Sequence, residues 1–379
     1  MSLINRSWLI ALLIFSMNAC SQKEKKYVPV KRSNFQIKHD GKSIDLYTLE
    51  NANGMKVQLT NYGGKVVSIL VPDREGKMGD VALGYESAQE YIDGIASLGA
   101  TMGRYANRIA FAKFTLDDST YHLDKNNGQH SIHGGFEGFR FQVWDARQID
   151  DQTLELRYFS KDGEGGYPGN VTVKAVYSVT NDNELKIEYS ASTDKPTVIN
   201  LTNHTFFNLA GEGNGKVLDH TLYVNAQQFT PVDSTAIPTG ELRDVKGTPF
   251  DFTTPTKIGK RIDQDNRQLH NVGGYDHNFV LDKEPGELAL AARLSEPATG
   301  RVMEEYTTEP GLQVYTANSL TGEGNQIGKG GHPYGPRSAV CLETQHFPDS
   351  PHHPNFPTTV LRPGEDYHST TVYKFTTKN

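Results

Sequence analysis

The stretch Val171-Thr-Val-Lys-Ala-Val-Tyr-Ser-Val-Thr180 decides the class of fold, because apolar side chains recur along it at every second position. A period of two places alternate side chains on opposite faces of a strand, whereas a helix repeats every 3.6 residues. Residues 185–189 repeat the pattern with Leu185, Ile187 and Tyr189 against Lys186 and Glu188. The two segments predict antiparallel strands with one buried and one solvated face.

Strand signals continue on both sides of this stretch, and helical periodicity is scarce. Further strands are predicted at 44–49, 55–59, 65–71, 222–224, 278–281, 288–294, 312–315, 340–344 and 371–375, and one short helix at 87–92. The 36 glycines and 18 prolines suit many strands joined by turns. No repeat of fixed period and no later linker divides the chain. The sequence therefore predicts one all-β domain over 35–379, a large, mostly antiparallel β-sandwich.

The composition is that of a globular protein with a sizeable core. The chain has 379 residues, of which 36% are hydrophobic and 22% charged. Its formal net charge of −7 argues against nucleic-acid binding, because phosphate recognition needs a clustered basic face. We therefore expect no nucleic-acid partner.

Residues 1–20 are predicted to be a signal peptide. Arg6 supplies a positive start, and the apolar run at 8–17 is too short to span a bilayer. The run ends at Ala19-Cys20, which resembles a bacterial lipoprotein signal, in which the cysteine becomes the lipidated N-terminus. An ordinary secretory peptide with a chance cysteine is the alternative. Both interpretations predict export, and the first predicts membrane attachment through Cys20 alone.

The polar, lysine-rich residues 21–34 are predicted to be a flexible tether between anchor and domain. The chain has only two cysteines. If Cys20 is lipidated, Cys341 has no partner for a disulfide, and the count excludes a zinc site built from cysteine pairs.

Residues 197–209 begin like a strand and carry His204 among amides and aromatics. Asn203 flanks the histidine, and Phe206, Phe207 and Asn208 follow it. A rigidly held imidazole can act as an acid or base near neutral pH, and the aromatics and amides suit a sugar ring and its hydroxyls. The alternative is a core histidine whose hydrogen bonds its neighbours satisfy.

Four other motifs carry candidate site residues. The segment 103–109 places Asn107 beside Arg108, residues 130–135 place His133 before two glycines, residues 273–279 present Asp276, and residues 339–345 carry Glu343. A guanidinium and an amide together suit a hydroxylated ligand. In a strand, Glu343 shares its face with Ala339, Cys341 and Gln345. A surface arginine in a turn and a salt-bridged strand glutamate are the structural alternatives.

His346, His352 and His353 lie in or beside a proline-rich segment and are the only candidates for metal ligands. Their spacing does not match a known set of metal ligands, and no residues that would orient such ligands are evident, so we expect no metal. The triplet of glycines at 211–215 lacks the strand-to-helix setting of a phosphate loop and is predicted to be a turn.

Seven blocks, in this order, resemble the aldose 1-epimerase family, also called galactose mutarotase. They are Gly-Arg-Tyr-Ala-Asn-Arg-Ile (103–109), His-Gly-Gly (133–135), Asp-Gly-Glu-Gly-Gly-Tyr-Pro-Gly-Asn (162–170), Asn-Leu-Thr-Asn-His-Thr-Phe-Phe-Asn-Leu (200–209), Gly-Tyr-Asp-His-Asn-Phe (274–279), Tyr-Thr-Thr-Glu-Pro-Gly-Leu-Gln-Val-Tyr-Thr (306–316) and Leu-Glu-Thr-Gln (342–345). The resemblance covers about 35–375. The signal peptide and tether depart from the family's cytoplasmic members.

The resemblance implies a galactose mutarotase-like supersandwich with an open carbohydrate cleft. It implies that Glu343 is the general base at the anomeric hydroxyl, that His204 is the general acid at the ring oxygen, and that His133 assists. It further implies that the sugar hydroxyls are held by Asn107, Arg108, Asp276 and Gln313. The expected activity is the interconversion of α and β anomers of free aldohexoses, by a protein expected to be a monomer.

One acid and one base suffice for this reaction, without redox change, nucleophile or cofactor. At their ordinary pKa values of about 6.5 and about 4.3, an imidazole can start as the proton donor and a carboxylate is already ionised near neutral pH. Two other functions stay open: a non-catalytic carbohydrate-binding lipoprotein, and a hydrolase or lyase that uses Glu343 and Asp276 as paired carboxylates.

Overall fold

A computed structural model describes residues 29–94 and 96–378 of the chain. The predicted signal peptide, Cys20 and most of the predicted tether lie outside these residues. Val30 is buried, and its backbone N–H and carbonyl both form hydrogen bonds with the side chain of Gln58. The short 3-10 helix η1 (Arg32–Asn34) follows, and Arg32 donates a hydrogen bond to Asp45. The packed part of the chain thus begins before Phe35.

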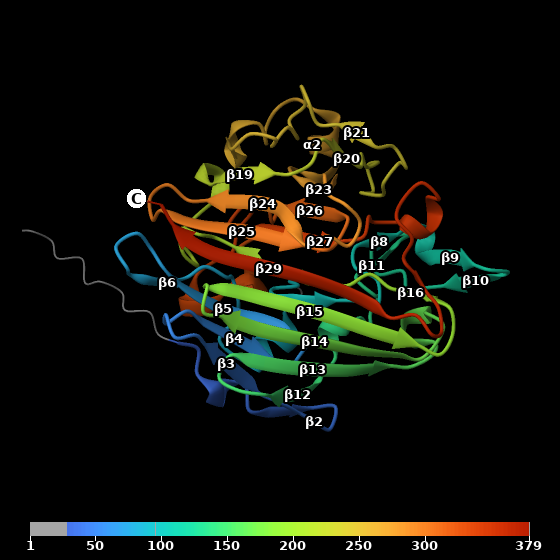
Figure 1. The fold of residues 1–379 in the computed structure, drawn as a ribbon, viewed down its shortest axis with the longest axis horizontal. Helices are drawn as coiled ribbons and strands as arrows, with labels where there is room; N and C mark the ends of the chain where they lie inside the picture. Colours follow the sequence, from blue (N-terminus) through green and yellow to red (C-terminus); the bar gives the residue numbers. More distant parts are fainter. Residues whose placement is uncertain (1–28, 95, 379) are drawn as a thin grey trace, which may run out of the picture.

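The largest sheet has nine antiparallel strands and forms one layer of the fold (Figure 1). In spatial order they are β12 (Asp145–Gln148), β13 (Thr153–Ser160), β14 (Val171–Thr180), β15 (Glu184–Thr193), β29 (Tyr367–Thr377), β25 (Arg301–Thr307), β24 (Ala289–Ser295), β19 (Thr221–Val224) and β22 (Thr256–Lys257). The stretch that decided the fold class is β14, which pairs along its whole length with β15. Its odd-numbered residues are buried, as the period of two predicts.

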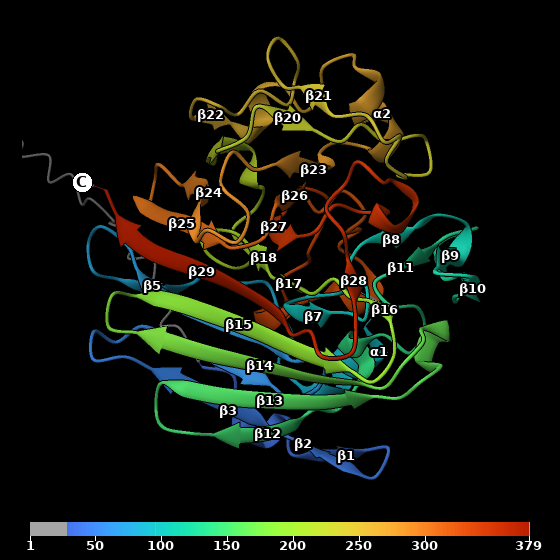
Figure 2. The same cartoon turned by 45° about the vertical axis from the view of Figure 1, so that its right-hand side comes forward.

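Two further sheets face the nine-stranded one. One comprises β18 (Phe206–Phe207), β27 (Val340–Gln345), β26 (Gly311–Tyr315), β23 (Asp276–Val280), β20 (Gln228–Phe229) and β21 (Arg243–Asp244). The other comprises β3 (Leu46–Glu50), β4 (Lys56–Thr60), β5 (Lys65–Pro72) and β6 (Met78–Asp80). One hydrophobic core joins all three sheets: Val57 and Ile69, Val173 and Ile187, and Leu312 and Val340 all belong to it. The layering confirms the predicted antiparallel sandwich (Figure 2).

Short elements surround the sandwich. The two-stranded sheets pair β1 (Ile37–His39) with β2 (Lys42–Ile44), β7 (Ala100–Met102) with β17 (Thr202–His204), β8 (Arg108–Ile109) with β11 (Ser131–Ile132), β9 (Lys113–Leu116) with β10 (Ser119–His122), and β16 (Thr197–Val198) with β28 (Val360–Leu361). The α-helices in the described chain are α1 (Ala88–Asp93), which confirms the predicted short helix, and α2 (Arg267–Val272), which the sequence did not predict. None of the described helices is long and apolar enough to cross a bilayer.

Residues 197–209 do not form one strand. They divide into β16, β17 and β18, and these pair with three different partners: β28, β7 and β27. The segment therefore passes from one sheet to another, with His204 at the end of β17, one residue before the chain joins the six-stranded sheet. This crossing brings the histidine beside strands that are distant in sequence.

Candidate active site

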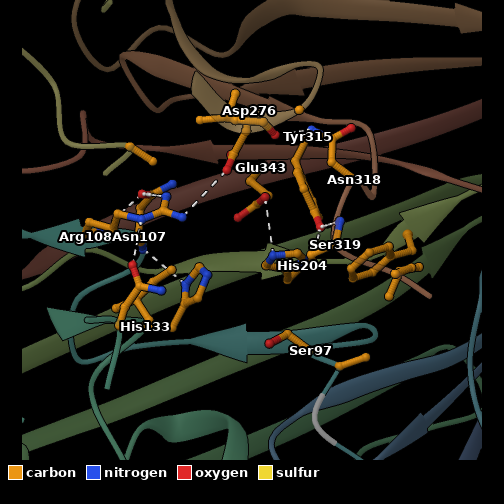
Figure 3. Close-up of a pocket in the computed structure, with 18 of the residues that line it drawn as sticks. Ser97, Asn107, Arg108, His133, His204, Asp276, Tyr315, Asn318, Ser319 and Glu343 are labelled. Carbon is orange, nitrogen blue, oxygen red and sulfur yellow. Dashed lines mark hydrogen bonds and ion pairs between the residues drawn. The ribbon is translucent and has the colours of Figure 1, made fainter. Parts of the chain in front are cut away.

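A cleft of about 670 Å³ gathers most of the predicted site residues (Figure 3). Its lining includes Asn107, Arg108, His133, His204, Asp276 and Glu343. Arg108, His204, Asp276 and Glu343 come from β8, β17, β23 and β27, Asn107 directly precedes β8, and His133 directly follows β11. The site is thus assembled from both small and large sheets. Gln313 does not line the cleft and contacts it through Asp276.

His204 is fixed by its backbone and by two aromatic rings. It pairs with Ala100 across β17 and β7, and its carbonyl accepts a hydrogen bond from the Gly99 N–H at 2.9 Å. Its ring stacks on Phe206 at a centroid distance of 5.0 Å and meets Tyr315 edge-on at 6.1 Å. The ring is buried, and its Nε2 atom lies 3.5 Å from Oε1 of Glu343.

Glu343 lies in the middle of β27, directly opposite Gln313 of β26. Val340 and Leu342 on the same strand point into the main core, so the period of two directs Cys341 and Glu343 to the other face. The carboxyl is buried, and its Oε2 atom has no hydrogen-bond partner among the residues that the structure describes. That oxygen therefore has no protein partner that would compete with a hydrogen bond to a bound ligand.

Burial shifts the two groups in opposite directions. It raises the pKa of Glu343 well above its ordinary value, with the charge of Asp276 adding to the effect and Arg108 opposing it. It lowers the pKa of His204 to about 3, with the charge of Arg140 adding to the lowering. Burial thus favours the neutral form of each group. Desolvation therefore works against a protonated imidazole facing a carboxylate in the free site, and the roles of the two residues stay predictions.

His133 and Asn107 hold one another in place. Both have positive φ angles, 52° and 60°, in the left-handed region. The His133 N–H donates to the Asn107 carbonyl at 3.0 Å, and the Asn107 N–H donates to Nδ1 of His133 at 3.2 Å. Since Nδ1 accepts, the neutral ring carries its hydrogen on Nε2. Burial lowers the pKa of His133 well below its ordinary value, and repulsion from positive charge on His204, Arg140 and Arg108 adds to the lowering.

Arg108, Asp276 and Gln313 form a polar wall beside Glu343. Arg108 Nη2 lies 3.7 Å from Asp276 Oδ2, and Gln313 Nε2 donates to Asp276 Oδ1 at 2.6 Å. Arg108 also donates through Nε to Asn127 at 3.2 Å. Fixed donors and acceptors of this kind suit vicinal hydroxyl groups.

Phe206, expected from the sequence as an aromatic that suits a sugar ring, lines the cleft, whereas Tyr315, Ser97 and Arg140 are lining residues that were not predicted. Phe206 and Tyr315 supply the aromatic contacts of His204, and the period of two from Gln313 could have indicated Tyr315. Ser97 and Arg140 also line the cleft. Neither carries a sequence signal, since only the tertiary fold brings them to His204. Arg104, by contrast, lies in the Gly-Arg-Tyr motif but is buried against the carbonyls of Pro168 and Gly169 and takes no part in the cleft.

The described residues contain one group with metal-ligand geometry. Ligand atoms of His204, Cys341 and Glu343 lie within 4.8 Å of one another. Burial raises the pKa of the Cys341 thiol well above its ordinary value, which disfavours the thiolate that binds metals. Two of the histidines that the sequence offered as candidate metal ligands contact carboxylates outside this group. His346 contacts Glu309 at 2.6 Å, and His352 contacts Asp349 at 2.6 Å.

Residues 45–374 match the model of the family described as aldose 1-epimerase. The chain belongs to this family. The rat galactose mutarotase is 40% identical over 349 residues, which is 92% of this chain and 99% of that protein. The aldose 1-epimerase of Escherichia coli K12 is 38% identical over 338 residues, 89% of this chain and 96% of that protein.

Solved structures agree with the fold of this epimerase-family chain. An aldose epimerase homologue from C. elegans superposes with a TM-score of 0.82 at 29% identity and covers 89% of this chain and 100% of its own. A galactose 1-epimerase from Lactobacillus acidophilus superposes with a TM-score of 0.80 at 30% identity and covers 90% and 97%. The predicted family and fold are thus confirmed, whereas the roles of individual residues remain predictions.

Proposed function

We propose that this chain interconverts the α and β anomers of free aldohexoses such as glucose and galactose by general acid–base ring opening and closure. The observation that carries the proposal is the buried contact of 3.5 Å between His204 Nε2 and Glu343 Oε1 in a cleft lined by hydroxyl-binding groups. Family membership supports the same isomerase activity.

Ring opening removes a proton from the C1 hydroxyl and adds one to the ring oxygen. Glu343 takes the first proton and His204 supplies the second, so that afterwards the carboxyl is protonated and the imidazole is neutral. Rotation about the C1–C2 bond exposes the other face of the carbonyl. Closure then returns one proton from Glu343 to O1 and one from the C5 hydroxyl to His204, so the pair ends as it began.

Burial favours the neutral form of both groups, and hence a proton on Glu343, which is the distribution that follows ring opening. Opening therefore begins when this proton passes from Glu343 to His204 across their contact. Arg108 lowers the pKa of Glu343 and so favours the carboxylate needed at that moment. Neither transfer requires a cofactor or a metal.

The remaining residues orient the sugar. Asp276 accepts from hydroxyl groups and Arg108 donates to them, while Gln313 fixes the Asp276 carboxylate. Asn107 binds a hydroxyl beside Arg108, and His133 donates from Nε2 at the end of the cleft where His204 lies. The edge of Tyr315 and the face of Phe206 hold the acid rigidly, which lets proton transfer occur without reorganising the site.

For the N-terminus we propose export with lipidation of Cys20, which rests on the sequence of residues 1–20 and not on the described fold. The enzyme would then act on sugars outside the cytoplasm. We further propose that the enzyme is a monomer.

Polarimetry tests the activity. Purified protein added to freshly dissolved α-D-glucose or α-D-galactose should accelerate the decay of optical rotation to the same final value as the uncatalysed reaction. A carbohydrate-binding protein would leave the rate unchanged, and a hydrolase or lyase would act on glycosides and not on free sugars. The rival in which Glu343 and Asp276 act as paired carboxylates is disfavoured because Asp276 is engaged by Arg108 and Gln313.

A further inference from the structure

A second arginine, Arg140, lines the cleft on the wall formed by Ser97. It lies in the 3-10 helix η3 (Phe139–Phe141), and its Nη1 donates to the Ser97 hydroxyl at 2.5 Å. Its Cζ atom lies 4.4 Å from the centroid of the Phe141 ring, which supports the plane of the guanidinium. The side chain is thus held in position without any ligand.

The charge of Arg140 has no acidic partner. Among residues 29–94 and 96–378, no carboxylate lies within 4 Å of this guanidinium, and its buried Nε has no hydrogen-bond acceptor. Arg108, in the same cleft, contacts Asp276. Burial lowers the pKa of Arg140 to about 10, which still leaves it charged at neutral pH. A half-buried cation without a counter-ion costs stability, and an anionic ligand would remove that cost.

The two arginines act on different members of the catalytic pair. Ser97 precedes the Gly99 and Ala100 backbone that binds His204, and in Figure 3 Ser97 lies below His204 while Glu343 and Asp276 lie above it. The electrostatics agree for the catalytic pair: the charge of Arg140 acts on His204, whereas Arg108 and Asp276 act on Glu343, and His133 feels both arginines. Arg140 therefore belongs to the side of the acid.

The position of Arg140 beside His204 determines which carbon of a bound sugar lies near it. In the proposed reaction, on which the inference rests, Glu343 meets O1 and His204 meets the ring oxygen. The ring oxygen bonds to C1 and to C5, and C5 carries C6. A pyranose with O1 at Glu343 thus turns its C6 group past His204, toward Ser97 and Arg140.

We propose that Arg140 and Ser97 form a subsite for an anionic group on C6, so that hexuronic acids or hexose 6-phosphates are exchanged more efficiently than the neutral aldoses on which the same site acts. The guanidinium offers parallel N–H donors that match a carboxylate or phosphate, and the Ser97 hydroxyl adds a third donor. The bound anion would also neutralise the charge that opposes protonation of His204. Binding of the charged substrate thereby favours the proton shift that starts ring opening.

The test compares D-galacturonate, D-galactose 6-phosphate and D-galactose in two measurements, anomer exchange by NMR and binding by calorimetry with equilibrated sugars. For the wild type, kcat/KM with an anionic sugar should be about 10–100-fold higher than with galactose, which is the usual scale of a charge-assisted hydrogen bond. Arg140→Met should lower kcat/KM and affinity for the anionic sugar at least tenfold more than for galactose. Arg140→Lys should restore part of the difference, and Arg147→Met, on the exposed strand β12, serves as the control.

The two anionic sugars distinguish the carboxylate from the phosphate as the bound group. Equal kcat/KM and affinity for all three sugars, or an Arg140→Met variant that weakens all three equally, would overturn the subsite and assign Arg140 a structural role. Binding that depends on Arg140 in a protein that exchanges no anomers would sustain the subsite and refute the proposed activity.

Discussion

The Nε2 atom of His204 lies 3.5 Å from Oε1 of Glu343, and both side chains are almost fully buried. This contact makes the two residues one proton-sharing unit. Glu343→Gln and His204→Asn should each lower kcat by about 10²–10⁴-fold, the range typical of general acid–base catalysis. The double variant should be little worse than the worse single variant, because residues that act as a unit are not additive.

Anomer exchange measured by NMR for the three variants, with thermal melts to verify folding, checks this prediction. A folded Glu343→Gln protein with near-wild-type exchange would remove Glu343 as the base. His133 and Asp276 would then be the next candidates.

The pH profile should reveal the inverted proton distribution. The active pair carries one proton, so activity falls when the pair gains a second proton or loses the first. Since the pKa of His204 is lowered to about 3, the acid limb of kcat/KM should lie near pH 3 and reflect protonation of His204. The alkaline limb should reflect loss of the proton from Glu343, whose pKa is raised. Polarimetric rates from pH 3 to 9 test this, and an acid limb near the ordinary carboxyl value of 4.5 would contradict it.

Glu305 on β25 should reduce stability as the pH rises. Its carboxyl is buried between the sheets beside Tyr373, and burial raises its pKa well above 4.5. Between 4.5 and the raised value the unfolded chain loses this proton while the folded chain keeps it, so stability falls by about 1.4 kcal/mol per pH unit. Glu305→Gln should therefore raise the free energy of unfolding at pH 7 by up to about 3 kcal/mol, with little gain at pH 4.

Urea denaturation of Glu305→Gln at pH 4 and pH 7 measures the effect. The neighbouring Glu304→Gln is the matched control, because Glu304 points to the other face of the strand and bonds Arg293, so its loss should not stabilise the protein. An equal gain at both pH values would show that packing, and not titration, is responsible.

Chelation should leave the reaction rate unchanged, because proton transfer between Glu343 and His204 accounts for the chemistry without a Lewis acid. The measurement is mutarotation after exhaustive treatment with a chelator and buffer exchange. A large loss of rate that added metal restores would instead make His204, Cys341 and Glu343 a metal site, since their ligand atoms are within 4.8 Å. Cys341→Ala would then abolish the restoration.

Cys20 is predicted to become the lipidated N-terminus after cleavage of the residues that precede it. Mass spectrometry of the mature N-terminus should show a modified Cys20, and Cys20→Ser should move the protein out of the membrane fraction. A mature chain that starts at an unmodified Ser21, or that retains residues 1–20, would contradict lipidation.

Local patterns in the sequence were sufficient for the class of fold. The alternation in 171–180 survives as the buried face of β14, because a period of two fixes which side chains share a face in any sheet. The same rule separated Glu343 from Leu342 on β27. The motif blocks, through their resemblance to a family, also indicated seven site residues, and the structure brings them together in or against one cleft.

Only the tertiary structure decided how these residues act. Residues 197–209 contain enough β-formers for one strand, yet they divide among three sheets, because His204 must cross between layers to meet Glu343. The protonation states followed from burial, which no local pattern reveals. Arg140 and Ser97 are 43 residues apart in sequence and far from either catalytic residue along the chain. The sequence determined which groups the protein possesses, whereas packing between layers determined their distances, their desolvation and hence their charges.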